Sequence, residues 1–275
     1  MASQKKQTEN YGTLGSPISS VVRAFSILEL LSTRHRFNLE HLSRKSGLAK
    51  PTVYRFLNTL RDLGYVRRDD NDQYYITLKL FTIGSRALDH MDLPVIAHPV
   101  AENLSEKLHE TVHMGVRDEF EATYILKIES KYTLRMYSRV GRKIPLYCTA
   151  IGKALLVENS EEELQEYVND TRLVPFTPNT ITDIDSLKRE LDSIRETGVS
   201  NDREEHEEGI RCIAGLIRDY TGSIVAALSV SWPTFRFDPD KENDYTTAIR
   251  SAADEISGIL GWDSRTLKTP SLSTT

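Results

Sequence analysis

Two serines in the stretch SIVAALSVSW are the first residues whose spacing indicates a binding site. Alternate residues of a strand point to one face of a sheet, so Ser229 and Ser231 are expected to present two hydroxyls on the same side. Cys212 stands in IRCIAGL between Ile210 and Ala214, on one face of a second expected strand. These groups can hydrogen-bond a small polar ligand. On a half-exposed sheet, the serines would instead simply face water.

The segment LYCTAIGKALL supplies a second part of such a site, the start of a helix after Thr149. The first amides of a helix have no acceptor within it and lie at the positive end of its dipole. Ala150, Ile151 and Gly152 are small enough, or turned enough, to let an anion approach them. Asp202 would accept hydrogen bonds from ligand hydroxyls. Together these groups predict a binding site for a carboxylate that carries a hydroxylated chain.

Catalysis is the alternative interpretation of the same segments. Cys148 or Cys212 with His206 would suggest a thiol nucleophile, but Cys212 lies between Ile210 and Ile213, which favours a buried structural thiol. His206 stands in EEHEE, which we interpret as a solvated loop. Its neighbouring glutamates are too close for a metal site, and a matching third segment is missing. We therefore expect no enzyme, no metal and no cofactor.

A third constellation lies in GLAKPTVYRFLNTLRDLGYV, residues 47–66. Helical spacing defines one buried stripe made of Val53, Phe56, Leu57, Leu60 and Leu63. The outer face carries hydrogen-bonding residues of modest reach: Lys50, Thr52, Tyr54, Arg55 and Asn58. Arg and Lys pair with phosphate or guanine, Asn with adenine, and the Thr methyl contacts thymine. The pattern predicts a DNA-reading helix; the alternative is a surface helix of an ordinary three-helix domain.

Charge supports the DNA interpretation. The whole chain of 275 residues has a net charge of −5, but residues 1–80 carry 13 Lys+Arg and 7 Asp+Glu, a net of +6. The remainder carries 22 and 33, a net of −11, which fits a basic DNA-binding module joined to an acidic partner domain. No apolar run is long enough to span a bilayer and no secretory signal is evident. We expect a reduced cytoplasmic protein with no membrane partner.

The elements that must position these residues follow from spacing and from helix caps. A helix is expected over 19–32 with Ser19 or Ser20 as N-cap, and a second, LEHLSRKS, between Asn38 and Gly47. YVRRDDNDQYYIT reads as two strands joined by a polar turn, which places Arg67 and Arg68 on a wing near the DNA backbone or minor groove. A solvated arginine pair is the alternative. The order predicts a winged helix-turn-helix.

The domain boundaries follow from this order. We expect a disordered tail over 1–17, the DNA-binding domain over 18–78, a stiff linker helix over 79–93, an effector-binding domain over 94–263 and a second disordered tail over 264–275. In the larger domain helices alternate with strands, several of them adjacent in sequence, which is typical of an α+β fold. The expected strands there are TVHMGVRD, ATYILKIES, LRMYSRVG and the segments near 210–218 and 223–232.

Four segments in order along the chain carry a family resemblance: TVYRFLNTLRDLGYV, ITLKLFTIGSRAL, LRMYSRVGRKIPLYCTAIGKALL and DREEHEEGIRCIA. They resemble the IclR family of transcriptional regulators, and within it the branch of 2-keto-3-deoxygluconate regulon repressors. The resemblance covers about residues 18–262. It implies a winged N-terminal domain, a linker helix, a GAF-like effector domain, and dimers or dimers of dimers.

The resemblance also implies a binding site for a small acid, a sugar acid or 2-keto acid. Two backbone amides, at Ala150 and Ile151, and the side chains of Asp202, Cys212, Ser229 and Ser231 match the family's effector-binding positions. Further candidates for the pocket wall or the core are Met136, Tyr147 and His113, and candidates for a second carboxylate contact or a surface salt bridge are Arg135 and Arg139. We expect a repressor that binds double-stranded operator DNA as a homodimer or tetramer. An activator, or a sugar-acid enzyme with a DNA-binding module, is the alternative.

Overall fold

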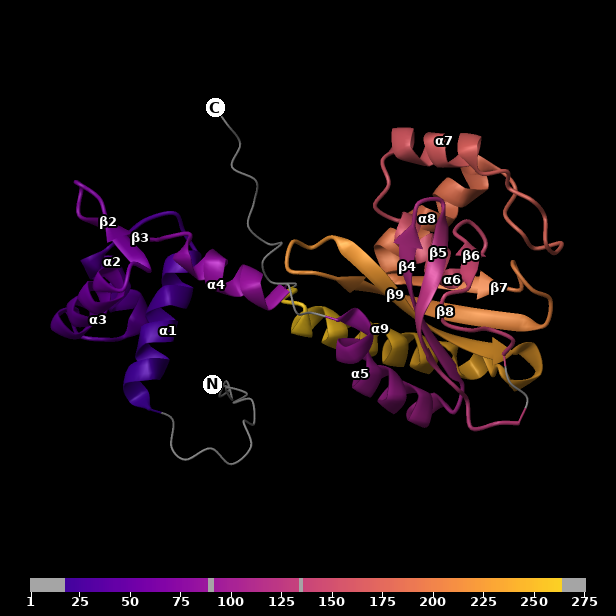
Figure 1. Cartoon of the computed structure of the whole chain (residues 1–275), viewed down its shortest axis with the longest axis horizontal. Coiled ribbons are helices and arrows are strands. Elements are labelled where there is room, and N and C mark those ends of the chain that lie inside the picture. The colour runs from indigo at the N-terminus through magenta and orange to yellow at the C-terminus, as the bar shows by residue number, and fades with distance from the viewer. Residues whose placement is uncertain (1–17, 89–91, 134–135, 264–275) are drawn as a thin grey trace, which may run out of the picture. The chain divides into compact units, whose positions relative to one another are not determined.

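The computed structural model describes residues 18–88, 92–133 and 136–263 and divides into two compact units, Met1–Met91 and Asp92–Thr275 (Figure 1). The two tails expected at 1–17 and 264–275 lie outside the described residues. Each unit has its own hydrophobic core. None of the helices in the described part of the chain is long and apolar enough to cross a lipid bilayer.

The N-terminal unit is a small helical domain with a three-stranded sheet. Its helices are α1 (Ser19–Ser32), α2 (Leu39–Ser46), α3 (Lys50–Asp62) and α4 (Lys79–Leu88). Its strands are β1 (Phe37–Asn38), β2 (Val66–Arg68) and β3 (Gln73–Ile76), in the order β1-β3-β2. Helices α2 and α3 form the helix-turn-helix, and β2 and β3 form the wing that follows it.

Local signals explain where α2 and α3 begin and end. The Asn38 side chain accepts a hydrogen bond from the His41 amide at 2.8 Å, as an N-cap residue does. Gly47 ends α2 with φ of 69°, a left-handed conformation that glycine adopts more readily than residues with a Cβ. Pro51 occupies the first turn of α3, where no hydrogen bond from its nitrogen is needed.

Two expectations for this unit were wrong. Ile18, not a serine, is the N-cap of α1 and makes no side-chain hydrogen bond, because Ser19 already lies inside the helix. In α3, Val53, Leu57 and Leu60 are buried as expected, but Leu63 is 52% exposed. Leu63 follows the last helical residue, where the chain turns away from the core.

The C-terminal unit is built on a six-stranded antiparallel sheet in the order β6-β5-β4-β9-β8-β7. The strands are β4 (Thr111–Asp118), β5 (Glu121–Ile128), β6 (Lys143–Pro145), β7 (Val199–Arg203), β8 (Ile210–Arg218) and β9 (Ile224–Pro233). The helices are α5 (Leu93–Leu108), α6 (Ala150–Leu156), α7 (Glu161–Asp170), α8 (Ile184–Thr197) and α9 (Glu242–Ile259), with short 3₁₀ turns at Thr234–Arg236 and Pro239–Lys241.

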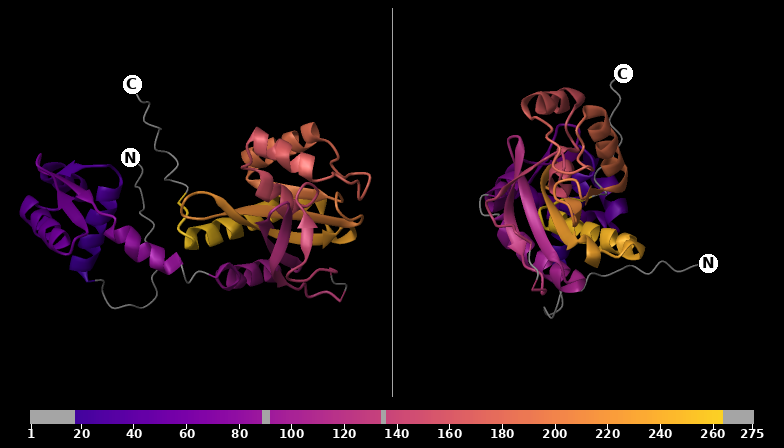
Figure 2. Two further views of the ribbon diagram at one scale, coloured as in Figure 1. Left: turned by 45° about the horizontal axis from the view of Figure 1, so that its top comes forward. Right: turned by 90° about the vertical axis from the view of Figure 1, so that its right-hand side faces the viewer.

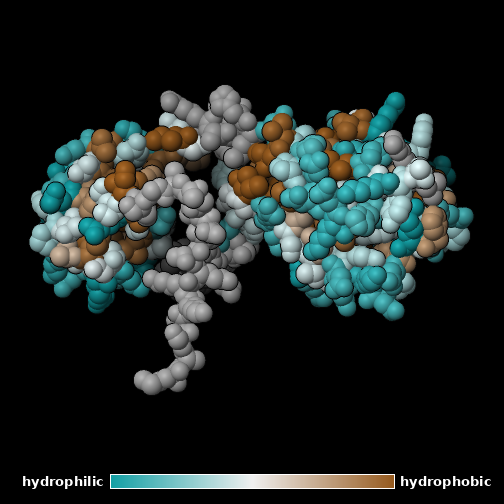
Figure 3. All heavy atoms as spheres, turned by 90° about the horizontal axis from the view of Figure 1, so that it is seen from below, coloured by the Kyte–Doolittle hydropathy of each residue, from teal (hydrophilic) through white to brown (hydrophobic). Residues whose placement is uncertain are grey.

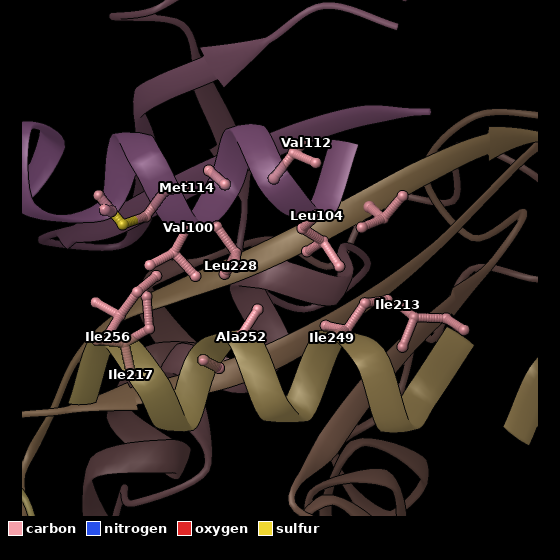
Figure 4. Packing of buried hydrophobic residues seen from close by; sticks show 14 of the residues in the cluster. Val100, Leu104, Val112, Met114, Ile213, Ile217, Leu228, Ile249, Ala252 and Ile256 are labelled. Atoms are coloured by element: carbon pink, nitrogen blue, oxygen red, sulfur yellow. The ribbon is translucent and has the colours of Figure 1, made fainter. Parts of the chain in front are cut away.

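The sheet separates two helical layers (Figure 2). Helices α5 and α9 cover one face, where side chains such as Val100, Leu104, Ile249 and Ile256 pack on Leu228 of the central strand β9 (Figure 4). Helices α6, α7 and α8 cover the other face through a second core. The fold is therefore α+β, as the sequence predicts, with three layers in the larger unit.

The structure differs from the expected elements at two places. Of the segment LRMYSRVG, the described residues 136–141 are irregular and form no strand, and the short β6 follows them. Strand β7 was not predicted, because VSNDR is short and polar and shows no clean alternation. Within the expected linker over 79–93, the structure describes α4 (Lys79–Leu88) and the first residue of α5, Leu93.

Candidate functional site

A cavity of about 410 Å³ opens on the α6 side of the large sheet. All six residues that the sequence proposed for an acid-binding site line it: Ala150, Ile151, Asp202, Cys212, Ser229 and Ser231. They come from α6 and from three neighbouring strands, so segments far apart in the sequence converge here. A cavity of this size falls within the range typical of small-molecule sites.

Strand register explains the convergence. Asp202 on β7 pairs with Cys212 on β8, and Cys212 pairs with Ser231 on β9. Directly paired residues point to the same face, so these three side chains form one row. Ser229, two residues before Ser231, lies in the next row and pairs with His113 on β4. The serines are 3% and 5% exposed, so they do not face bulk water.

A chain of hydrogen bonds runs through the pocket wall. The Cys212 thiol donates to Ser231 Oγ at 3.2 Å, Ser231 Oγ lies 3.4 Å from His113 Nδ1, and His113 Nε2 lies 2.7 Å from Ser138 Oγ. Burial and the nearby Lys127 lower the pKa of His113 to about 3. The imidazole is therefore neutral at physiological pH, and one of its nitrogens accepts while the other donates.

Ser229 is the polar side chain that this network leaves out. The residue is buried, and its hydroxyl opens onto the cavity without a hydrogen-bond partner among the described residues. A hydroxyl that is open to a cavity can exchange hydrogen bonds with water or with a ligand oxygen. Ser229 is therefore a candidate contact for a polar ligand atom.

The start of α6 presents the backbone amides of Ala150 and Ile151. The Thr149 hydroxyl donates to the Pro145 carbonyl at 2.7 Å and accepts from the Gly152 amide at 3.0 Å, so the third amide of the helix is capped. The two amides before it have no acceptor within the helix. Gly152 permits this arrangement, because a Cβ there would lie 2.3 Å from the backbone of Leu146.

Asp202 is the acidic group of the pocket. Its Oδ1 accepts a hydrogen bond from the Glu205 amide at 2.8 Å. Burial raises the pKa of Asp202 to about 7, and that hydrogen bond and the positive charge of Lys153 only partly oppose the effect. Near neutral pH the carboxyl group can therefore either accept or donate a hydrogen bond.

Several lining residues were not singled out by sequence reasoning. Arg142, Tyr124 and Glu207 line the cavity, and the Tyr124 ring stacks on His113 with ring centroids 4.6 Å apart. Arg142 lies in an irregular segment just before β6, so no spacing pattern marks it. Arg142 makes no ion pair within the described part of the chain and donates to the Tyr137 carbonyl.

Some of the further pocket candidates from the sequence line the cavity and others do not. His113 and Met136 line the cavity. Tyr147 does not: it is buried in the core, and its hydroxyl donates to the Val174 carbonyl at 2.7 Å. Arg139 is exposed and does not line the cavity, and Arg135 lies outside the described residues.

The interpretation of EEHEE as a solvated loop was wrong in part. Glu205 is buried against Lys153, and His206 lines the cavity with its ring against Phe176, at a centroid distance of 5.1 Å. Burial also raises the pKa values of the Cys148 and Cys212 thiols, which disfavours a thiolate nucleophile at either position. Within residues 18–88, 92–133 and 136–263, no group of three His, Cys, Asp or Glu side chains has the geometry to hold a metal ion.

In the N-terminal unit, α3 and the wing carry the candidate DNA contacts. Of the α3 candidates, Lys50, Tyr54 and Arg55 are exposed and Thr52 and Asn58 are half-buried; the two wing candidates, Arg67 and Arg68, are exposed. Lys50 lies 3.4 Å from Glu40, and Arg68 lies 2.6 Å from Asp72.

Arg55 and Arg67 differ from these two cations. Neither makes an ion pair with any residue that the structure describes, so their guanidinium groups are available to an outside partner. Guanidinium groups are suited to phosphates and base edges. Asn58 differs from them, because its amide oxygen is buried and has no hydrogen-bond partner in the described structure.

Fold and site together define a class of protein: a ligand-responsive regulator in which a winged helix-turn-helix is joined to a sheet domain with a small-molecule pocket. The chain belongs to the IclR family of bacterial transcriptional regulators, because residues 20–70 match the IclR helix-turn-helix domain and residues 85–258 match the IclR C-terminal domain. It is therefore a DNA-binding transcriptional regulator.

Individual relatives agree with this assignment. The HTH-type transcriptional regulator KdgR of Escherichia coli (strain K12) is 42% identical over 246 residues, which cover 89% of this chain and 94% of the relative. The HTH-type transcriptional repressor AllR of the same strain is 34% identical over 241 residues, covering 87% and 89%. The crystal structure of Thermotoga maritima IclR is 35% identical and covers 90% of this chain and 100% of its own, with a TM-score of 0.60.

Proposed function

We propose that this chain is a cytoplasmic repressor whose affinity for operator DNA is set by a small acid with a hydroxylated chain, a sugar acid or 2-keto acid. The relatives named as a KdgR regulator and an AllR repressor support this assignment. The observation that carries it is the cavity itself, which all six predicted residues line and onto which the unpaired Ser229 hydroxyl opens. Such a cavity offers a polar ligand several hydrogen-bonding groups.

Each part of the ligand has a matching group in the cavity. The carboxylate would lie at the free amides of Ala150 and Ile151, where backbone N–H groups favour an anion, and Arg142 adds a positive charge to the wall. Hydroxyl or keto oxygens would meet Ser229 and Asp202. A neutral apolar molecule would leave these groups unpaired, at a cost of about 1–3 kcal/mol each.

The operator would be read by the outer face of α3. Arg55 is exposed on α3 and is suited to base edges, and Arg67 on the wing is suited to phosphate. The half-buried Asn58 would have to turn its amide group outward to reach a base. Lys50 and Arg68 would first have to leave Glu40 and Asp72. Exposed ion pairs of this kind are worth only about 0–1 kcal/mol, so DNA phosphates can displace them.

A second copy of the chain would cover an apolar surface on the same unit. A groove of about 460 Å³ lies between α1, α3 and α4, and Val21, Phe25 and Ile83 along it are 49%, 58% and 51% exposed. Figure 3 shows apolar side chains at the surface of this unit. Helix-turn-helix proteins bind two half-sites as dimers, so a homodimer, or a tetramer of two such pairs, is the assembly we propose.

The dimer has its own test. Phe25→Glu places a charge in the proposed contact and should shift sedimentation of the full chain from dimer toward monomer, with at least tenfold weaker binding to a palindromic operator. Glu29→Gln changes an exposed residue one helical turn away and serves as the control. A Phe25→Glu protein that sediments like the wild type would disprove this contact.

The function is tested with the full chain and a duplex selected by the protein from random DNA. A panel of sugar acids is screened by thermal shift, since a ligand that binds only the folded state raises the melting temperature by mass action. Operator affinity is then measured by fluorescence anisotropy with and without the acid that binds. A binding acid that leaves operator affinity unchanged would refute the regulatory role, because an effector must differ in affinity for the two states that it shifts.

A further inference from the structure

A buried ion pair lies behind the pocket and touches neither the proposed ligand nor the proposed DNA. Lys153, on α6, is 0% exposed, and its Nζ lies 2.6 and 2.7 Å from the two carboxylate oxygens of Glu205. Glu190 of α8 lies 2.9 Å from the same nitrogen. An ammonium has three N–H donors, so all three are directed at carboxylate oxygens. Neither Lys153 nor Glu205 lines the cavity.

Stability alone does not account for this pair. Removing two charges from water costs several kcal/mol per ion, and apolar side chains of similar volume often stabilise a buried site equally well or better. The contacts of the pair indicate instead that it holds two parts of the molecule in place.

On one side, the pair holds the loop that carries Asp202. The Glu205 amide donates to Asp202 Oδ1 at 2.8 Å, and the Glu205 carboxylate accepts from the Arg203 amide at 3.3 Å. The Glu205 carbonyl accepts from the Thr180 hydroxyl at 2.6 Å. The backbone and the side chain of Glu205 are thus both fixed, and the orientation of the Asp202 carboxyl depends on that of its neighbour.

On the other side, the pair holds α6. Lys153 is the fourth residue of this seven-residue helix, and its amide donates to the Thr149 carbonyl at 2.9 Å. The pocket-lining Ala150 and Ile151 lie within one turn of it, so the position of the lysine is linked directly to theirs. The ion pair therefore joins the two walls of the cavity, the start of α6 and the end of β7.

We propose that Lys153 and Glu205 are positioning residues of the effector site: they hold the free amides of α6 and the carboxyl group of Asp202 at the separation that a bound acid requires. This inference rests on the proposed function of the pocket. It assigns a role in effector binding to two residues that contact no ligand. The test below distinguishes that role from a role in folding.

The test measures, by isothermal titration, the affinity of the full chain for 2-keto-3-deoxygluconate or, where the wild type does not bind it, for the acid of the panel that the wild type binds most tightly. Glu205→Gln keeps the shape of the side chain and removes its charge. The double variant Lys153→Met with Glu205→Leu replaces the whole pair by apolar side chains, which restores stability where the charges served only the core. Glu190→Gln alters the half-exposed third partner of the same ammonium and is the matched control.

We expect Glu205→Gln and the double variant to bind the acid at least tenfold more weakly, while they bind operator DNA like the wild type and the control binds the acid within twofold of wild type. A double variant that is as stable as the wild type and binds the acid within threefold would overturn the proposal. Failure of both variants to fold would assign the pair to the core and would also overturn it. Absence of binding by the wild type to every acid in the panel would instead refute the proposed function itself.

Discussion

Replacing Asp202 by asparagine should stabilise the C-terminal unit at pH 8 while it impairs the response to the effector. In the unfolded chain the carboxyl group ionises with its ordinary pKa of 3.8, whereas burial raises the pKa to about 7 in the folded protein. Between these pH values the folded state binds the additional proton. Stability therefore falls as the pH rises through this window, and the penalty is complete above pH 7 and absent below pH 4.

The size of the effect follows from the shift. About three pKa units at about 1.4 kcal/mol each give an upper limit of about 4 kcal/mol. Asparagine keeps an oxygen that can accept from the Glu205 amide. Its new NH₂ group must find partners, which costs about 1–3 kcal/mol if it does not. We therefore expect a net gain of roughly 1–3 kcal/mol at pH 8.

Urea unfolding followed by tryptophan fluorescence measures this gain. Both tryptophans of the chain, Trp232 and Trp262, lie in the C-terminal unit, so their fluorescence reports on that unit and not on the DNA-binding domain. The difference between variant and wild type should shrink as the pH falls from 8 to 4. A variant that is less stable than the wild type, by an amount that does not depend on pH, would refute the reasoning. It would show that the Asp202 carboxylate is stabilised in the folded protein by Lys153.

Three further predictions test the other groups. Arg55→Ala should weaken operator binding by about 1–3 kcal/mol if the side chain reads a base, without changing how steeply the affinity falls with salt concentration. Anisotropy at several ionic strengths measures this salt dependence. A change confined to the salt dependence would indicate a phosphate contact instead. Arg142→Gln should weaken acid binding about tenfold in calorimetry, or about 1.4 kcal/mol. Arg139→Gln, on the exposed part of the same segment, should not weaken it. Equal effects of the two substitutions would contradict a role for the pocket-lining guanidinium of Arg142. Gly152→Ala should destabilise the C-terminal unit by about 2–4 kcal/mol in urea unfolding, because the new Cβ would lie 2.3 Å from the backbone of Leu146. Gly258→Ala, in the open part of α9, should not destabilise it. Similar unfolding curves for the two variants would rule out the close approach at Gly152.

The sequence predicted best those elements that local chemistry specifies. The capping residue Asn38 and the left-handed Gly47 each act over a few residues, so α2 was predicted with the right bounds. The burial of residues along α1 is not specified by such local signals. Helical spacing shows which residues share a stripe but not which part of the stripe another element covers, and the N-terminal part of α1 remains exposed.

The same limit applies to the site. Ser229 and Ser231 could be assigned to one face because a strand alternates with a period of two, and the register then places them in the pocket wall. Arg142 and Glu205 follow no period. They lie in irregular segments, and their roles arise from contacts with residues that are distant in sequence, such as the 2.6 Å contact between Glu205 and Lys153. Only the folded chain brings such groups together.

A polar group of the pocket destabilises the folded protein, and the effector is expected to offset this effect. A substitution in the pocket can therefore raise stability while it impairs regulation. Asp202 is held where ionisation is disfavoured, and the Ser229 hydroxyl opens onto the cavity without a partner among the residues that the structure describes. An acid that exchanges a hydrogen bond with Asp202 offsets that penalty, and its oxygens can pair with Ser229. Its binding energy can shift the regulator only if the pocket differs between the DNA-bound and the DNA-free state. A variant such as Asp202→Asn removes part of the cost in both states, and should therefore be more stable and less responsive.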